Sequence, residues 1–274
     1  MQISIITINY NDLDGLQKTM SSVLEQTYSK IEYIVIDGGS TDGSADYIAS
    51  KKEALSYWVS EPDKGIYNAM NKGIDKATGK YLLFLNSGDW LFNANVLGRI
   101  ACELNNDIDI IYGNLLKVYN KDKIVQDTGP KSNNLTLNTF YTGTINHPSS
   151  LIRKELFDKY GLYDENLKIV SDWKFFLIAI GINNAKVRYL NSNISYFDMS
   201  GLSNLNVTER NLERKKVLKE LLPKSILEDY KTLNNTIKEY NRLNSNFMAF
   251  KNKKIIKFLM RIKSFYNRIL AKKQ

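Results

Sequence analysis

Residues 81–89 read Tyr-Leu-Leu-Phe-Leu-Asn-Ser-Gly-Asp, and this stretch decides the fold. Its apolar run stops at a small polar turn that ends in the carboxylate of Asp89. A short apolar run bounded by turn-forming residues is typical of a strand that is buried on both faces, as in a parallel sheet. Ligands of open α/β sheets bind beyond the carboxyl ends of such strands. Asp89 is therefore expected to lie where a metal ion or a substrate group binds.

Similar apolar runs and amphipathic segments alternate along the first part of the chain. The pattern predicts strands over 3–9, 31–36, 57–60 and 81–85, and helices over 13–27, 44–52 and 66–77. Alternation at this spacing implies right-handed strand–helix–strand units. The expected fold class is α/β, with a central, mostly parallel sheet flanked by helices.

The pattern becomes less regular after Asp89. It predicts helices over 91–106, 153–160 and 171–181, strands over 108–119 and 185–190, and an irregular polar segment over 121–142. Residues 207–222 and 225–244 are helical in pattern. We expect two parts, an α/β domain over 1–205 and a helical extension over 206–274.

The residue types limit the chemistry. The chain has one cysteine, Cys102, so it forms no intramolecular disulfide, which fits a reducing compartment. With a single histidine as well, a structural zinc site is not expected. A bound metal would need oxygen ligands, which favours Mg²⁺ or Mn²⁺.

The net charge of +9 is unevenly divided. From Asn206 onward there are 18 Lys and Arg and 6 Asp and Glu, so this part carries +12 and the first 205 residues carry −3. A nucleic-acid enzyme would carry its positive charge across the main binding face, so nucleic acid is not the expected partner. No basic segment precedes the first strand and no apolar run approaches the roughly 20 residues that span a bilayer, which predicts a cytoplasmic protein.

Two predicted strands end in turns that carry an aspartate, Asp37 and Asp89. No Gly-x-Gly-x-x-Gly or Gly-Lys-Ser/Thr motif follows the first strand, so neither a dinucleotide site nor a P-loop is expected. An aspartate at such a turn either accepts hydrogen bonds from a base or ribose, or ligates an ion that neutralises a diphosphate. The alternative is that each aspartate only caps the next helix.

Four motifs in order carry a more specific signal. They are residues 5–11 (Ile-Ile-Thr-Ile-Asn-Tyr-Asn), 36–43 (Ile-Asp-Gly-Gly-Ser-Thr-Asp-Gly), 60–73 (Ser-Glu-Pro-Asp-Lys-Gly-Ile-Tyr-Asn-Ala-Met-Asn-Lys-Gly) and 84–89. Together they resemble family 2 glycosyltransferases of the GT-A fold, over roughly residues 1–205. The resemblance is strongest to the bacterial branch that builds O-antigen, capsule or exopolysaccharide.

The resemblance implies a site for a UDP-, GDP- or dTDP-linked sugar. Residues expected to contact the donor are Ile8, Asn9, Tyr10, Asp37, Lys64, Asn68, Asn71, Ser87 and Gly88. Asp89 would be the metal-binding end of the family's Asp-x-Asp motif, with Mg²⁺ or Mn²⁺ as the cofactor. Here the motif reads Ser87-Gly88-Asp89, so its first carboxylate is missing.

Asp172 opens an apolar-aromatic helical segment and is the candidate catalytic residue. By resemblance it would be the general base that takes the proton of the acceptor hydroxyl, a role that suits a partly buried carboxylate. The alternative is a first-turn aspartate favoured only by the helix dipole. His147, Trp173, Ser200 and Gly201 are further candidates for contact with the acceptor or the diphosphate.

The basic C-terminus predicts a partner of its own. Apolar residues at 255, 259, 262, 266 and 269 recur at helical spacing, with Lys253, Lys254, Lys257, Arg261, Lys263 and Arg268 around them. A basic amphipathic helix suits an anionic membrane surface. The alternative is a helix packed on the catalytic domain. The family resemblance implies a lipid-linked glycan acceptor, so we expect a peripheral enzyme at the inner face of the cytoplasmic membrane.

The sequence thus predicts an inverting glycosyltransferase. One alternative is a sugar nucleotidyltransferase, although the Gly-rich, basic loop typical of that class is absent after Asn11. The other is a non-catalytic membrane- or nucleic-acid-binding module that works through the basic tail.

Overall fold

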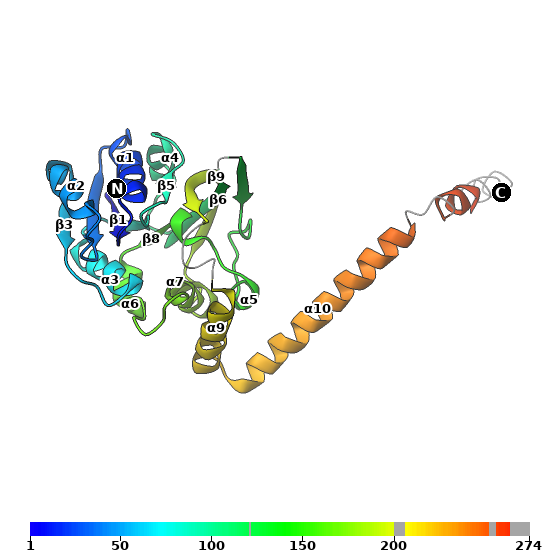
Figure 1. The fold of residues 1–274 in the computed structure, drawn as a ribbon. Coiled ribbons are helices and arrows are strands. Elements are labelled where there is room, and N and C mark those ends of the chain that lie inside the picture. The colour runs from blue at the N-terminus through cyan, green and yellow to red at the C-terminus, as the bar shows by residue number, and fades with distance from the viewer. Residues whose placement is uncertain (121, 200–205, 252–255, 264–274) are drawn as a thin grey trace. The chain divides into compact units, whose positions relative to one another are not determined.

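The computed structural model describes residues 1–120, 122–199, 206–251 and 256–263. The chain forms two compact units, Met1–Val217 and Leu218–Gln274. Their boundary lies inside helix α9 (Val207–Leu221), and the domain boundary expected at 205/206 stays a prediction. The first unit is an α/β structure, as the sequence predicts (Figure 1).

The strands of the first unit form one mixed sheet. They are β1 (Ile3–Asn9), β2 (Ile31–Asp37), β3 (Tyr57–Ser60), β4 (Tyr81–Phe84), β5 (Trp90–Leu91), β6 (Ile110–Asn120), β7 (Lys123–Asp127), β8 (Ser150–Arg153) and β9 (Val187–Asp198). Within the described residues the order is β3-β2-β1-β4-β8-β6-β9-β5, and β7 pairs with β6. The first four strands of this order are parallel, whereas β8 runs antiparallel to both of its neighbours.

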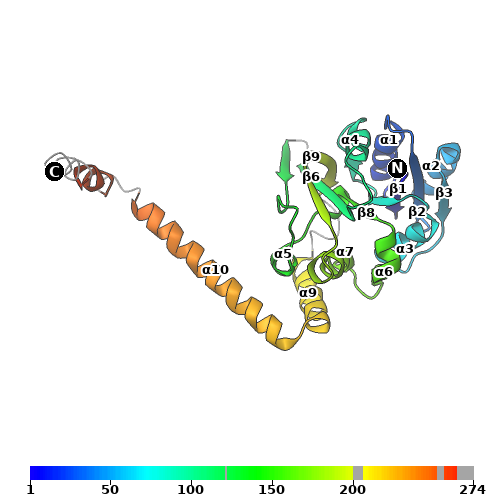
Figure 2. The same cartoon turned by 180° about the vertical axis from the view of Figure 1, so that it is seen from behind.

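Helices cover both faces of the parallel strands. The helices of this unit are α1 (Leu13–Leu24), α2 (Ser44–Ser50), α3 (Ile66–Lys76), α4 (Val96–Ala101), α5 (Leu137–Thr142), α6 (Glu155–Tyr160) and α7 (Ser171–Phe176), with short helical turns η1 (Lys52–Ala54) and η2 (His147–Ser149) and a π-helical continuation η3 (Leu177–Ile182). Side chains of α1, α2 and α4 share one core with alternate residues of β1, β2 and β4. Helix α3 packs on the other face, and Figures 1 and 2 show α3 and α6 on the side opposite α1 and α4.

Close packing of α3 on β1 depends on a glycine. A Cβ on Gly73 would lie 2.4 Å from Cγ2 of Ile6, which is fully buried. Because the interior is close-packed, a methyl group at this point displaces either the helix or the strand.

Three expectations for the second half of the first unit were wrong. The helix expected over 91–106 is only the two-turn α4, because residues 90–91 pair with β9. The irregular segment over 121–142 contains β7 and α5. Strand β8 was not predicted, because its four buried residues are too few to show a period.

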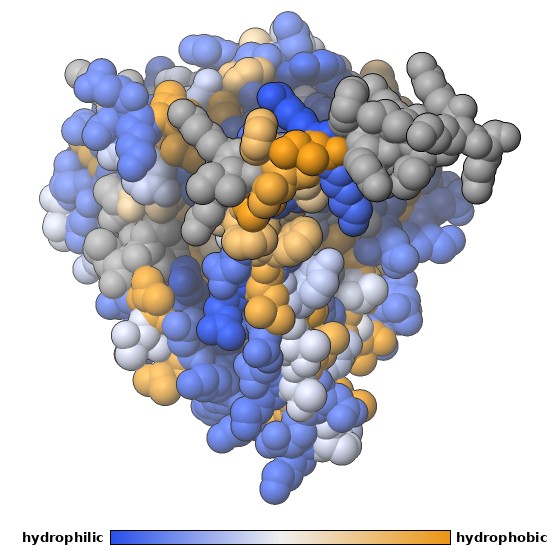
Figure 3. All heavy atoms as spheres, turned by 90° about the vertical axis from the view of Figure 1, so that its right-hand side faces the viewer, coloured by the Kyte–Doolittle hydropathy of each residue, from blue (hydrophilic) through white to orange (hydrophobic). Residues whose placement is uncertain are grey.

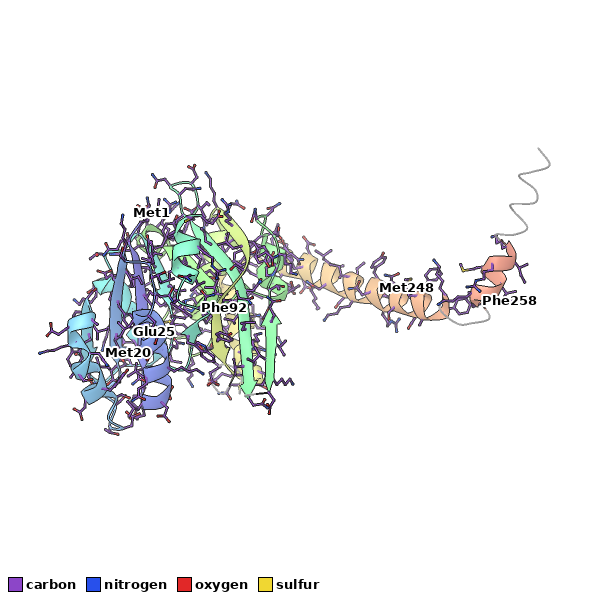
Figure 4. The ribbon with its side chains drawn as sticks, turned by 90° about the horizontal axis from the view of Figure 1, so that it is seen from above. Met1, Met20, Glu25, Phe92, Met248 and Phe258 are labelled. Carbon is purple, nitrogen blue, oxygen red and sulfur yellow. The ribbon has the colours of Figure 1, made fainter. Side chains whose placement is uncertain are left out.

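The second unit is dominated by one long helix. Helix α10 (Lys224–Lys251) has no buried residue, and residues 256–263 are helical as well. Met248 and Phe258, labelled in Figure 4, are 50% and 63% exposed. On the face of the molecule drawn in Figure 3, apolar side chains lie among hydrophilic ones. None of the helices described is long and apolar enough to cross a membrane.

We predict that Gly73→Ala lowers the free energy of unfolding by about 1–3 kcal/mol, because the added methyl group overpacks the contact with Ile6. Chemical denaturation of the two proteins measures the difference. Gly98→Ala in α4 is the matched control, since a Cβ there meets nothing within 4 Å. That change is expected to leave stability equal or raise it by about 0.5–1 kcal/mol. Equal stability of Gly73→Ala and wild type would contradict the packing argument.

Candidate functional site

The carboxyl ends of the parallel strands gather the first group of predicted residues. Asn9, the last residue of β1, lies in register with Asp37, the last residue of β2. The backbone N–H of Ser87 donates to the carbonyl of Ile8, so the turn after β4 lies beside the end of β1. Tyr10 follows β1 and is 68% exposed. The ends of β1 and β2 and the turn after β4 thus lie at one edge of the sheet.

Asp37 organises this edge. Its Oδ1 accepts hydrogen bonds from Asn9 Nδ2 and Ser40 Oγ, and its Oδ2 accepts from the backbone N–H of Ser40 and from Ser60 Oγ, at 2.6–2.9 Å. Burial alone would raise the pKa of Asp37, but these hydrogen bonds outweigh it and lower the pKa below its ordinary value. Because four protein donors occupy the carboxylate, it holds the loop in shape, and its contact with a nucleobase stays a prediction.

A side chain of α1 fixes the turn that ends at Asp89 by hydrogen bonds. Thr19 Oγ1 donates to the carbonyl of Asp89 at 2.6 Å and accepts from the backbone N–H of Gly88 at 3.1 Å. Gly88 has φ of +90°, a conformation that favours glycine. Thr19 was not singled out in the sequence, because a threonine inside an amphipathic helix gives no signal of such a contact.

Asp89 is a buried carboxylate with an unused oxygen. It is 3% exposed; Oδ1 accepts from the backbone N–H of Asp198 at 3.2 Å, while Oδ2 has no partner among the described residues. Burial raises the pKa of this carboxyl well above its ordinary value, and the charges of Asp198 and Asp12 raise it further. A charge buried in this way is costly unless a cation neutralises it.

Two other carboxylates lie near Gly88, the middle residue of the Ser87-Gly88-Asp89 motif. A Cβ built on Gly88 would lie 3.7 Å from Asp12 Oδ2 and 4.0 Å from Asp198 Oδ2. In the described part of the chain, no three His, Cys, Asp or Glu side chains are arranged to hold a metal by themselves. Mg²⁺ sites commonly use one or two carboxylates and complete their coordination with water and substrate phosphates. The residues around Asp89 therefore fit a divalent ion bound together with a diphosphate.

Asp172 lies at the start of α7, and a hydrogen bond fixes the position of one of its carboxylate oxygens. The hydroxyl of Tyr67 donates to its Oδ1 at 3.1 Å, and Asp172 Oδ2 has no hydrogen-bond partner among the described residues. Burial and the Asp172 charge raise the pKa of Tyr67 well above its ordinary value, so the phenol stays protonated and remains a donor. This is the geometry of a carboxylate that is oriented by one neighbour and free to accept a proton.

His147 is buried, and the charge of Asp172 acts on its ring. Its ring stacks on Phe84 with centroids 4.9 Å apart, and its Nε2 lies 2.7 Å from the hydroxyl of Tyr163. Burial lowers the pKa of His147, with the Asp172 charge acting in the opposite direction. At 7% exposure it supports the site from within, and its contact with a ligand stays a prediction.

Asn68 and Asn71 bind a loop of the protein itself. Asn71 exchanges two hydrogen bonds with the backbone of Tyr163, and both asparagines donate to the carboxylate of Glu165 at 2.9 Å. They fix the loop that precedes α7, so donor contact by either side chain stays a prediction. Lys64 donates its backbone N–H to Asn68 Oδ1.

The remaining candidates divide into two cases. Trp173 is 2% exposed, and its indole N–H donates to the carbonyls of Phe140 and Gly143, so it is a core residue at the site. Ser200 and Gly201 lie outside the described residues.

The two cavities described near the surface, of about 520 and 320 Å³, are lined by none of the predicted site residues.

Comparison with known proteins identifies the family. Residues 4–161 match the model "Glycosyl transferase family 2". The chain belongs to glycosyl transferase family 2. It therefore transfers a sugar from a nucleotide-sugar donor. The family expected from the four motifs and the α/β fold expected from the strand–helix alternation are confirmed.

One relative and two solved structures show how far the similarity extends. An uncharacterized glycosyltransferase of Mycobacterium tuberculosis is 37% identical over 185 residues, which cover 65% of this chain and 68% of the relative. TarS of S. aureus in complex with UDP has a TM-score of 0.65 at 20% identity, over 84% of this chain and 69% of that one. A mannosyltransferase of Pyrobaculum calidifontis in complex with GDP-Man and Mn²⁺ has a TM-score of 0.58 at 13% identity, over 96% and 84%. At these identities the two structures show the GT-A fold.

We predict that Asp89→Asn stabilises the metal-free protein at neutral pH. Since the folded-state pKa of Asp89 is raised, wild-type stability falls as the pH rises from the unfolded value of about 4 toward the raised value. The variant lacks this loss, so its Tm advantage should grow from pH 5 to pH 7, to a few degrees. Thermal unfolding without metal measures it, and Asp75→Asn, at an exposed carboxylate, is the control. A pH-independent difference would contradict the raised pKa.

Proposed function

We propose that the chain is an inverting, metal-dependent hexosyltransferase that glycosylates a hydroxyl group of a lipid-linked glycan during the synthesis of a bacterial surface polysaccharide such as O-antigen or capsule. The observation that carries the mechanism is a pair of carboxylates, Asp89 after β4 and Asp172 at the start of α7. Each has one oxygen for which the described residues provide no hydrogen-bond partner. Asp89 acts on the side of the leaving diphosphate, and Asp172 acts on the attacking acceptor hydroxyl.

On the donor side, the protein presents a preformed edge. Asp37 holds Asn9, Ser40 and Ser60 in place, and the exposed ring of Tyr10 lies beside them for contact with a nucleobase. Support for a nucleotide-sugar donor comes from the UDP and GDP-Man in the two similar structures, although the base differs between them. Asp89 would hold a Mg²⁺ or Mn²⁺ ion, which supplies positive charge to the departing diphosphate.

On the acceptor side, Asp172 acts as the general base. Its Oδ2 takes the proton of the acceptor hydroxyl while the hydroxyl oxygen bonds to the anomeric carbon. The bond from that carbon to the donor phosphate breaks, and the nucleoside diphosphate leaves with the bonding electrons. Tyr67 keeps Oδ1 fixed, so the free oxygen points at the reacting hydroxyl group.

The second unit supplies the support for a lipid-linked acceptor. Phe258 and Ile262 are exposed, and Lys257, Arg261 and Lys263 lie between and beside them with no acidic residue in the described segment 256–263. This combination suits the headgroup region of an anionic bilayer. The residues at 252–255 and 264–274, on which the predicted amphipathic helix also depends, lie outside the described residues.

Asp172→Asn is expected to lower turnover by at least about 100-fold, because an amide cannot take the acceptor proton. Donor binding should stay within about twofold of wild type, since Asp172 acts on the acceptor. Nucleotide-product release and thermal stabilisation by a panel of UDP-, GDP- and dTDP-sugars with Mn²⁺ measure the two quantities. The control is Asp164→Asn, whose carboxylate pairs with Lys174 nearby. Near-normal turnover in Asp172→Asn would show that another group is the base.

For the membrane proposal, the full chain should bind vesicles that contain phosphatidylglycerol far more tightly than neutral vesicles. Replacing Lys257, Arg261 and Lys263 by Gln removes charges worth about 1 kcal/mol each near the surface, so binding should weaken roughly 100-fold. The matched control replaces the exposed Lys30, Lys51 and Lys52. Co-sedimentation measures binding. Equal binding of both triple variants would contradict the proposed surface.

A further inference from the structure

Helix α9 reaches the segment that carries the candidate base. Glu213 Oε1 accepts a hydrogen bond from the backbone N–H of Lys168 at 2.7 Å. Its Oε2 accepts from the backbone N–H groups of Ile169 and Val170 at 3.0 and 3.2 Å. One carboxylate, 43–45 residues away in the chain, thus binds three consecutive N–H groups that end two residues before Asp172.

Glu213 holds the chain just before α7, where the sequence provides no side-chain cap; the N–H groups that it binds precede the first turn of the helix. Val170 stands at the N-cap of α7 and makes no side-chain capping hydrogen bond. Its apolar side chain has no acceptor to offer, so the chain that enters the helix depends on a partner from elsewhere. Hydrogen bonds from N–H groups to an ionised carboxylate are roughly twice as strong as neutral ones, so Glu213 is a firm anchor.

The other neighbours of Asp172 are fixed as well. Ser171 Oγ accepts from the backbone N–H of Asp164 at 2.5 Å. The indole of Trp173 donates to two carbonyls, and the guanidinium of Arg214 lies over its ring, 4.9 Å from the centroid. Glu213 and Arg214 are adjacent in α9, so one turn of this helix contacts the chain on both sides of Asp172.

We propose that Glu213 is a positioning residue for Asp172. The inference rests on the proposed role of Asp172 as the general base. Glu213 does not touch the substrates. It holds the backbone at 168–170, and through it the start of α7, so that the carboxylate of Asp172 stays at the distance from the acceptor hydroxyl that proton transfer needs. A displacement of about 1 Å at such a group costs on the order of 100-fold in rate.

The expected result for Glu213→Ala is a fall in kcat of roughly 10- to 100-fold, with the KM for the donor within about twofold of wild type. Glu213→Gln keeps one acceptor oxygen, so it should recover part of the lost kcat. Steady-state kinetics are normalised to the amount of protein that binds the donor, so unfolded protein is not counted. If Glu213→Ala does not fold, Glu213→Gln carries the test with a smaller expected fall in kcat.

Glu209→Ala is the matched control. Glu209 lies one turn earlier in α9 and pairs with the side chain of Lys168 at 3.2 Å, not with its backbone. This ion pair is exposed, with side-chain exposures of 78% and 40%, so its loss should leave kcat within about twofold of wild type.

A double variant separates positioning from general stability. If Glu213 acts through Asp172, the variant Glu213→Ala/Asp172→Asn should have the same residual rate as Asp172→Asn alone, since the group to be positioned is already disabled. A further fall in the residual rate, or a kcat of Glu213→Ala equal to wild type, would overturn the inference. An active Asp172→Asn would instead refute the proposed base, which is a different outcome from either of these.

Discussion

The site depends on a carboxylate that the fold buries and leaves half satisfied. Asp89 ends the turn that follows β4, a strand that is buried on both faces, and it is itself 3% exposed, so water does not stabilise its charge. The turn that carries it is fixed by Thr19 of α1, and the backbone of Asp198 holds one of its oxygens. Without a counter-charge, burial favours the protonated form of this carboxyl, as its raised pKa indicates. A divalent cation bound at this edge would favour the ionised form.

A second set of constraints places Asp172. Helix α7 is short, and its first turn is held by long-range contacts to the loop at 163–165, to the carbonyls of α5 and its neighbour, and to α9. Asn71 from α3 binds that same loop, and Tyr67 of α3 donates to the carboxylate. The donor edge and the base are therefore joined through α3, which packs on β1 without a gap at Gly73.

The sequence predicts the parallel half of the sheet well, because buried strands followed by Asp- and Gly-bearing turns give a strong local signal. The donor contacts at the end of these strands stay a prediction. The sequence fails to predict β8 and β7, which are short or exposed. Contacts over long sequence distances were also missed. Nothing in the neighbouring sequence predicts that Thr19 and Asp198 contact Asp89. Nothing there predicts that Glu213 contacts the segment before Asp172. Asn68 and Asn71 differ from these residues. They lie in a recognisable motif and were expected to contact the donor, but in the structure their side chains bind a loop of the protein itself.

The most direct test of the account is an anomalous diffraction map from a crystal grown with Mn²⁺ and a bound nucleoside diphosphate. The account predicts a Mn²⁺ peak about 2 Å from Asp89 Oδ2, the oxygen that has no partner in the described part of the chain, with diphosphate oxygens completing the coordination. A fully occupied nucleotide with no Mn²⁺ at Asp89, or with the ion bound elsewhere, would contradict it.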